Sequence, residues 1–178
     1  MGDGNFAGLA RQRGYVRRPA VGVGVSGAVS APSYGVGEAV RLVVQPARGD
    51  SHGGLLGMFP EMTHVGYVAT GLQLAPGDVV AVVKAESELA GAVAAGASEI
   101  EATGVEAGAE IVIGEGAAAE VAHVTGAQDG RLELRAPLGL AHGQAEPVRA
   151  VCQCEVLAAE DAAGRGHHVR LALRERVL

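Results

Sequence analysis

The sequence predicts an all-β protein: a small β-barrel with an inserted β-sandwich-like domain and a flexible N-terminal arm. Three observations support this prediction. First, 48% of the 178 residues are hydrophobic, mostly Val, Leu and Ala, although only 3% are aromatic, so the chain can bury an aliphatic core. Second, short segments of alternating polar and apolar residues recur between turn signals, at a spacing of roughly ten residues. Third, the charge is distributed very unevenly along the chain.

The charge distribution divides the chain into domains. Residues 86–150 hold eleven acidic and three basic side chains, a formal charge of about −8, whereas residues 1–85 carry about +2 and residues 151–178 are near neutral. A sharp acidic block between such flanks is typical of an insertion. We therefore predict an arm over 1–20, a barrel from 21–85 plus 151–178, and an inserted domain over 86–150. A solvated acidic face on a single domain is the alternative.

The flanking regions contain most of the predicted barrel strands. Alternation or apolar runs predict strands over 21–25, 39–44, 64–70, 79–83, 148–157 and 169–174. Residues 1–14 are Gly-rich and polar, which favours an arm or a short helix that is ordered only on a partner. Ala75-Pro76-Gly77-Asp78 is a turn signal, and residues 48–57 form a Gly-rich loop.

The acidic block has its own strand signals. Its alanines and glutamates favour a short helix over 86–97, although Gly91 and Gly96 weaken it. Strands are expected over 98–102, 110–113, 120–125 and 131–135, with Asp129-Gly130 as a hairpin turn.

Composition and motifs exclude several functional classes. A net charge of −6 argues against a general nucleic-acid binder, which needs a basic surface to displace counterions. The sequence has no apolar run of about 18 residues and no secretory signal pattern. We find no nucleophile elbow, phosphate loop or supported carboxylate pair, so we expect no enzyme activity and no cofactor.

Histidines and cysteines are the remaining candidate ligands. Adjacent His167 and His168 point to opposite faces of a strand and do not readily chelate one metal. Cys152 and Cys154 share a face, but we expect them to be small buried hydrophobic side chains, since no second cysteine pair completes a thiolate site. The acidic block contains a further group of two histidines and two glutamates: His123, His142, Glu115 and Glu120. One interpretation is that they form a metal site. The expected one is that they are solvated strand and loop positions.

Two separated stretches carry a resemblance to a known family. The first contains Val44-Gln45-Pro46-Ala47, then residues 64–70, then Ala75-Pro76-Gly77-Asp78. The second contains Cys154-Glu155-Val156-Leu157 and residues 163–175, with Gly164-Arg165-Gly166-His167-His168. Together they resemble the head–tail connector proteins of tailed bacteriophages, of the head-closure or stopper type. The block from about 91 to 148 resembles a small β module of phage and bacterial structural proteins, which the usual stopper lacks.

The resemblance implies a structural virion protein of the phage neck, assembled in the host cytoplasm. It implies a hexameric or dodecameric ring between the portal or adaptor and the tail-terminator or tail-tube proteins, with non-specific contact to DNA in the channel and none to a membrane. Such a ring closes the head, retains packaged DNA and docks the tail. Alternatives are a tail-terminator, baseplate or capsid-decoration protein, or, from another class, a surface- or carbohydrate-binding β module.

Two residue groups are the predicted sites of such contacts. An apolar set in the longer loop over 48–61 is the expected gating or interface element: Leu55, Leu56, Met58 and Phe59. A basic cluster is expected to dock the arm on the portal or on a neighbouring subunit: Arg11, Arg13, Arg17 and Arg18.

Overall fold

Within the residues that the structure describes, the protein is almost entirely β, with 56% of them in strands and 3% in helix, which confirms the predicted fold class. The computed structural model describes residues 10–20, 34–47, 58–69, 71–160 and 168–176. The predicted strand at 21–25 and the loop at 48–57 lie outside these residues. None of the helices in the described part of the chain is long and apolar enough to cross a membrane.

Ten strands and one short 3-10 helix follow one another along the chain. They are β1 (Gln12–Arg17), β2 (Glu38–Pro46), β3 (His64–Ala69), β4 (Val79–Glu88), β5 (Glu99–Glu101), β6 (Glu110–Ile113), η1 (Gly116–Ala118), β7 (Glu120–Gln128), β8 (Arg131–Leu134), β9 (Pro147–Glu160) and β10 (His168–Glu175).

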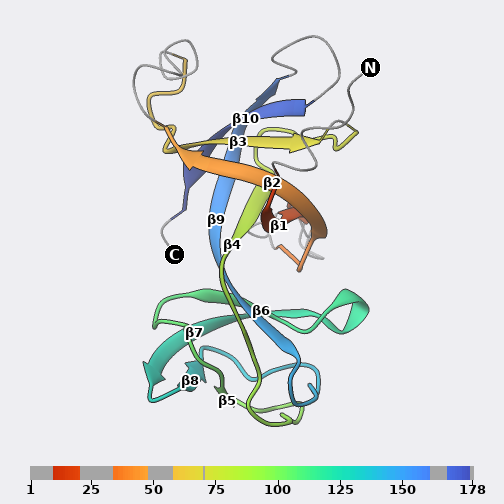
Figure 1. Cartoon of the computed structure of the whole chain (residues 1–178), viewed down its shortest axis with the longest axis vertical. Coiled ribbons are helices and arrows are strands. Elements are labelled where there is room, and N and C mark those ends of the chain that lie inside the picture. Colours follow the sequence, from red (N-terminus) through yellow and green to blue (C-terminus); the bar gives the residue numbers. More distant parts are fainter. Residues whose placement is uncertain (1–9, 21–33, 48–57, 70, 161–167, 177–178) are drawn as a thin grey trace, which may run out of the picture. The chain divides into compact units, whose positions relative to one another are not determined.

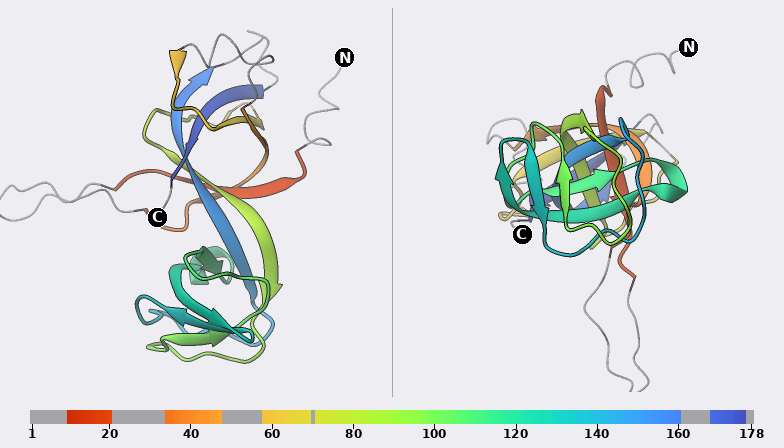
Figure 2. Two further views of the ribbon diagram at one scale, coloured as in Figure 1. Left: turned by 90° about the vertical axis from the view of Figure 1, so that its left-hand side faces the viewer. Right: turned by 90° about the horizontal axis from the view of Figure 1, so that it is seen from below.

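The described residues divide into two compact units. Met1–Val82 and Gln153–Val177 contribute to the first, and Val83–Cys152 forms the second. The chain passes between them within β4 and β9, so each of these long strands supplies residues to both units (Figure 2). The sequence-based boundaries at 86 and 150 fall within three residues of these divisions.

The first unit, which we call the barrel unit, is a closed six-stranded β-barrel (Figure 1). Its strands follow the order β10-β3-β2-β1-β4-β9, and β10 pairs with β9 to close the ring. β10 lies antiparallel to β3 from His168↔Ala69 to Leu173↔His64. On its other side β10 pairs with β9, with an irregularity after Ala172. Segments from both ends of the chain therefore build one barrel.

The second unit, which we call the acidic unit, continues the sheet through β9-β6-β7-β8-β5. Asp129 and Gly130 both have positive φ, at 50° and 81°, as expected for the tight turn between β7 and β8. Past β4, the chain donates a hydrogen bond from Ala90 N–H to the carbonyl of Glu101 at the end of β5, with a donor–acceptor distance of 2.9 Å.

Residues 89–93 also contact residues 142–146, and this contact, which we call the seam, completes the acidic unit. Leu89 N–H donates to the Glu146 carbonyl at 2.9 Å, and Ala145 N–H donates to the Leu89 carbonyl at 3.0 Å. Val93 and His142 exchange two backbone hydrogen bonds of 2.8 Å. The seam is thus held by a few separate hydrogen bonds rather than by a paired strand.

Each unit has its own aliphatic core. In the barrel unit, Leu42, Val65, Val156, Leu171 and Leu173 are fully buried. The core of the acidic unit is one cluster drawn entirely from that unit: Leu89, Ile100, Ala102, Ile111, Ile113, Ala122, Val124, Leu132, Leu134, Leu138 and Val148. No residue from 83 to 152 is Phe, Tyr or Trp, so this core is packed by aliphatic side chains alone.

A glycine permits close packing inside the barrel. A Cβ added to Gly66 in β3 would lie 2.8 Å from Cδ1 of Leu173 in β10. β3 therefore has no side chain where Leu173 of the neighbouring β10 packs against it, and a larger residue there would displace Leu173.

Two sequence-based expectations are wrong in part. Residues 12–17 of the predicted N-terminal arm form β1, which pairs with both β2 and β4. The predicted helix over 86–97 is absent from this described segment, because β4 continues to Glu88 and the chain then enters the seam. The strand signal here is the alternation of charged residues with less polar neighbours, at Lys84, Glu86 and Glu88. The alanine content of the segment favoured a helix and obscured this signal.

Candidate interface and polar sites

The predicted interface loop is only partly within the described residues. Leu55 and Leu56 lie outside them. Met58 is 72% exposed, as an interface residue would be. Phe59 instead packs, partly buried, against a small cluster of Met62, Val65 and Ala172. Phe59 therefore belongs at least partly to the core of the barrel unit.

The four arginines of the predicted docking cluster differ in exposure, since one is buried and three are exposed. Arg17 in β1 is only 1% exposed, and its Nε donates to the carbonyl of Val36 at 3.1 Å. Arg11, Arg13 and Arg18 are exposed, and Arg18 Nη2 donates to the Gln73 carbonyl at 3.3 Å. Arg17 is thus a structural residue, and the prediction that it docks a partner is wrong for a side chain this deeply buried.

The cysteines and His168 are integrated into the strands. Cys154 is buried, Cys152 is partly buried, and no disulfide joins the two. The ring of His168 lies edge-on to Tyr67 in β3, with centroids 5.6 Å apart. His167 lies outside the described residues.

Two ion pairs lie directly across the β9–β10 hairpin. Arg170 is opposite Glu160 and Arg174 is opposite Glu155. Arg170 Nε donates to Glu160 Oε1, and Arg174 Nη2 donates to Glu155 Oε2, each at 2.8 Å. Opposite charges at facing positions favour this strand register, which is the one that closes the barrel.

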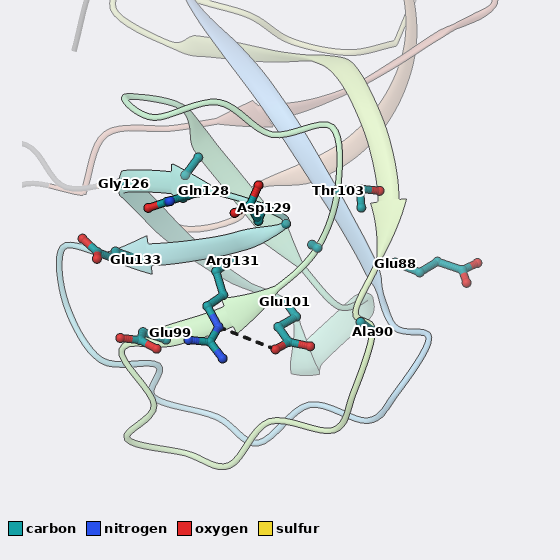
Figure 3. A pocket seen from close by; sticks show the side chains of 13 residues that line it. Glu88, Ala90, Glu99, Glu101, Thr103, Gly126, Gln128, Asp129, Arg131 and Glu133 are labelled. Carbon is teal, nitrogen blue, oxygen red and sulfur yellow. Dashed lines mark ion pairs between the residues drawn. The ribbon is translucent and has the colours of Figure 1, made fainter.

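An open hollow of about 900 Å³ lies on the acidic unit along β5, β7 and β8 (Figure 3). Five carboxylates line it, with Arg131 as the one basic side chain: Glu88, Glu99, Glu101, Asp129 and Glu133. Arg131 Nε lies 3.8 Å from Glu101 Oε1, and both side chains are largely exposed. This weak pair leaves the face negative, which disfavours contact with DNA phosphates.

A buried histidine joins two carboxylates beside the seam. The His142 side chain is fully buried, its Nδ1 lies 2.8 Å from Glu146 Oε2, and its Nε2 lies 2.8 Å from Glu120 Oε1. Glu120 also accepts backbone N–H bonds from Gly139 at 2.9 Å and Leu140 at 3.3 Å. Glu146 accepts one from Gly143 at 2.8 Å. We call His142, Glu120 and Glu146 the clasp.

The clasp perturbs the ionisation of its members. Burial alone would lower the pKa of His142, but the hydrogen bonds that the ring donates to Glu146 and Glu120, together with the negative charge of these carboxylates, outweigh burial and raise that pKa above 6.5. The hydrogen bond from Gly143, followed by that from His142, lowers the pKa of Glu146 below 4.5. Both shifts favour a charged His142 ring beside a charged Glu146.

A second charged network lies next to the clasp. Buried Arg149 donates from Nε to Glu86 Oε1 at 2.9 Å and from Nη2 to Glu115 Oε1 at 2.6 Å. Its Nη1 donates to the carbonyl of Gly114 at 3.2 Å. A Cβ on Gly114 would lie 3.2 Å from His142 Nδ1, so Gly114 separates the two networks.

The structure brings together only part of the proposed histidine cage. Glu120 contacts His142, whereas His123 lies 3.6 Å from Glu110 and Glu115 pairs with Arg149. We expected His142 to be exposed to solvent, and this prediction is wrong, because its side chain is fully buried. Within the described residues, no group of three or more His, Cys, Asp or Glu side chains is arranged to hold a metal ion.

No known protein-family model matches the chain, and no curated protein is significantly similar to it in sequence.

Proposed function

We propose that this chain is a structural virion protein of the phage neck, a head–tail connector of the stopper type. The ring it forms would lie between the portal or adaptor and the tail, close the head, retain packaged DNA and dock the tail. Its action would be steric, through the fit of subunit surfaces rather than through catalysis.

The observation that carries the proposal is the closure of the barrel by β10. The two stretches that resemble the connector family are far apart in sequence, yet β3 from the first pairs along its length with β10 from the second. β10 also pairs with β9, which includes the start of the second stretch. One small barrel from both stretches is the arrangement that the resemblance implies.

The distribution of charge supports a division of roles between the units. The exposed arginines Arg11 and Arg18 lie in the barrel unit, whereas the acidic unit presents the negative hollow. Arginine side chains attract DNA phosphates to the barrel unit, whereas the carboxylates of the hollow repel them from the acidic unit. We therefore assign contact with the portal and any contact with channel DNA to the barrel unit, and attachment of the remaining virion proteins to the acidic unit.

Deletion of the gene from a phage or prophage that carries it tests the proposal. We expect filled heads that lose their DNA, together with unattached tails, and restoration of complete particles when the gene is supplied in trans. Tails of abnormal length would indicate a tail terminator, and intact infectious particles would indicate decoration or a surface-binding module. Either of these results would overturn the stopper assignment.

A point variant tests the assembly surface. Met58→Ser should leave the subunit folded but reduce ring formation on purified portal, because it removes an exposed apolar side chain from the predicted interface. Leu140→Ser is the matched control, since Leu140 is an exposed apolar residue of the acidic unit. Equal loss of ring formation in both variants would contradict the assignment of the interface to this loop.

A further inference from the structure

We infer that the clasp stabilises the acidic unit in a pH-dependent way. It holds the two sides of the seam together when the His142 ring is protonated, and it no longer does so when the ring is neutral. This inference is independent of the proposed virion role. It rests on the positions of two ring nitrogens, four carboxylate oxygens and the backbone bonds of the seam.

The geometry requires a charged ring. A neutral imidazole has one N–H and one bare nitrogen lone pair, but both nitrogens of His142 lie 2.8 Å from a carboxylate oxygen. Both carboxyl groups are placed as acceptors, because each also accepts backbone N–H bonds, Glu120 from Gly139 and Leu140 and Glu146 from Gly143. The ring is therefore an imidazolium that donates to both carboxylates.

The clasp is placed to hold the seam. His142 exchanges its backbone hydrogen bonds with Val93, and Glu146 accepts from Leu89 through its own carbonyl. Gln144, between them, donates from Nε2 to the Ala90 carbonyl at 3.1 Å. Every residue of the clasp except Glu120 lies in the segment that forms one side of the seam, and Glu120 anchors that segment to β7.

Loss of one proton breaks this arrangement. The neutral ring keeps one N–H, and its bare nitrogen then faces a carboxylate oxygen at hydrogen-bond distance, which is repulsive. Glu146 is the carboxylate that leaves, because its side chain is 33% exposed against 18% for Glu120, and it is held by one backbone N–H rather than two. Its departure loosens residues 143–146, including their bonds to Leu89.

The other charges around the ring do not titrate in the same way. Arg149 in β9 donates to the carbonyl of Gly114, which borders the His142 ring, and it stays charged at all relevant pH values. Its partners are Glu86 in β4 and Glu115 after β6. The groups that face His142 itself are Glu120 and Glu146, so only the ring changes its charge as the pH rises from neutral to alkaline values.

The direction of the pH effect follows from the raised pKa of His142. A group whose pKa is higher in the folded protein stabilises it fully below its unfolded value, near 6.5, and this stabilisation is lost as the pH rises through the folded value. Glu146, whose pKa is lowered, stabilises the unit above about pH 4.5 and loses this effect as the pH falls through its folded value. The clasp is therefore strongest in mildly acidic solution.

Nitrogen-detected NMR titration of the histidines in the full chain is the direct test. We expect both ring nitrogens of His142 to carry protons at pH 6.5 and to titrate above that value. Amide hydrogen exchange of Leu89, Val93 and Ala145, corrected for its intrinsic pH dependence, should become several-fold less protected once the ring is neutral. A His142 that titrates at or below 6.5, or unchanged protection through its titration, would overturn the inference.

Variants separate the clasp from general pH effects. Glu120→Gln should lower the pKa of His142 and move the loss of protection to lower pH, because it removes one negative partner. His123→Gln is the matched control, since His123 lies in the same unit but 3.6 Å from its carboxylate and is partly exposed. A shift in the control as large as that in Glu120→Gln would also reject the clasp, and the titration of the unaltered chain keeps the test valid if a variant fails to fold.

Discussion

The two units complete their β structure by different means. The barrel unit is closed by β10, which pairs with β3 over six consecutive residue pairs and with β9 on its other side. The acidic unit is completed by a few separate backbone bonds at the seam, next to a charged histidine. Closure by a full strand depends on backbone hydrogen bonds and core packing, whereas closure at the seam also depends on one proton. The same chain therefore contains one closure by a fully paired strand and one that we infer to depend on the charge of a single histidine.

The largest expected effect comes from removing the acidic unit, which tests whether the barrel unit folds without it. Leu89 and Glu146 are bridged by a backbone hydrogen bond, so a short Gly-Ser turn can replace residues 90–145. We expect the shortened chain to keep a cooperative thermal transition by far-UV circular dichroism, because the barrel core draws on neither the removed strands nor their cluster. A broad, non-cooperative transition would show that the barrel depends on the acidic unit.

Matched core substitutions sharpen the comparison. Leu171 in the barrel and Ile111 in the acidic unit are both fully buried, and truncation of each to Ala should cost about 2–5 kcal/mol. Hydrogen exchange should show lower protection mainly in the unit that carries the substitution. Equal loss in both units after either substitution would mean that they unfold as one.

The smallest expected effect concerns the hairpin that closes the barrel. A double-mutant cycle of Arg174→Ala and Glu155→Ala should give a coupling energy below about 1 kcal/mol, because both side chains are partly exposed to solvent. High salt should reduce it further. A larger coupling that persists in salt would mean that charge, and not only strand pairing, holds the barrel closed.

Local patterns predicted most of the strands. Alternation in Arg131-Leu132-Glu133-Leu134 and the Asp129-Gly130 turn were sufficient to place β7 and β8, because an exposed face and a buried face leave a period of two in the sequence. Alternation also marked β10, where Leu171 and Leu173 are buried. The charge change near residues 86 and 150 indicated where the chain passes between units.

Features that depend on distant partners were not predictable. β1 was assigned to an arm because residues 1–14 are Gly-rich and polar, and it is a strand because β2 and β4 lie on either side of it. Arg17 is basic but buried, and the local sequence pattern does not predict that burial. The clasp joins His142 to Glu120, 22 residues away, and only the folded chain brings them together.

The uneven placement of aromatic residues has a practical consequence. Tyr15, Tyr34 and Tyr67 all belong to the barrel unit, and residues 83–152 have no aromatic side chain. Near-ultraviolet absorption and intrinsic fluorescence of the intact protein therefore arise outside the acidic unit. A single tryptophan introduced there would give each unit its own optical signal, so that the two could be followed separately in one sample.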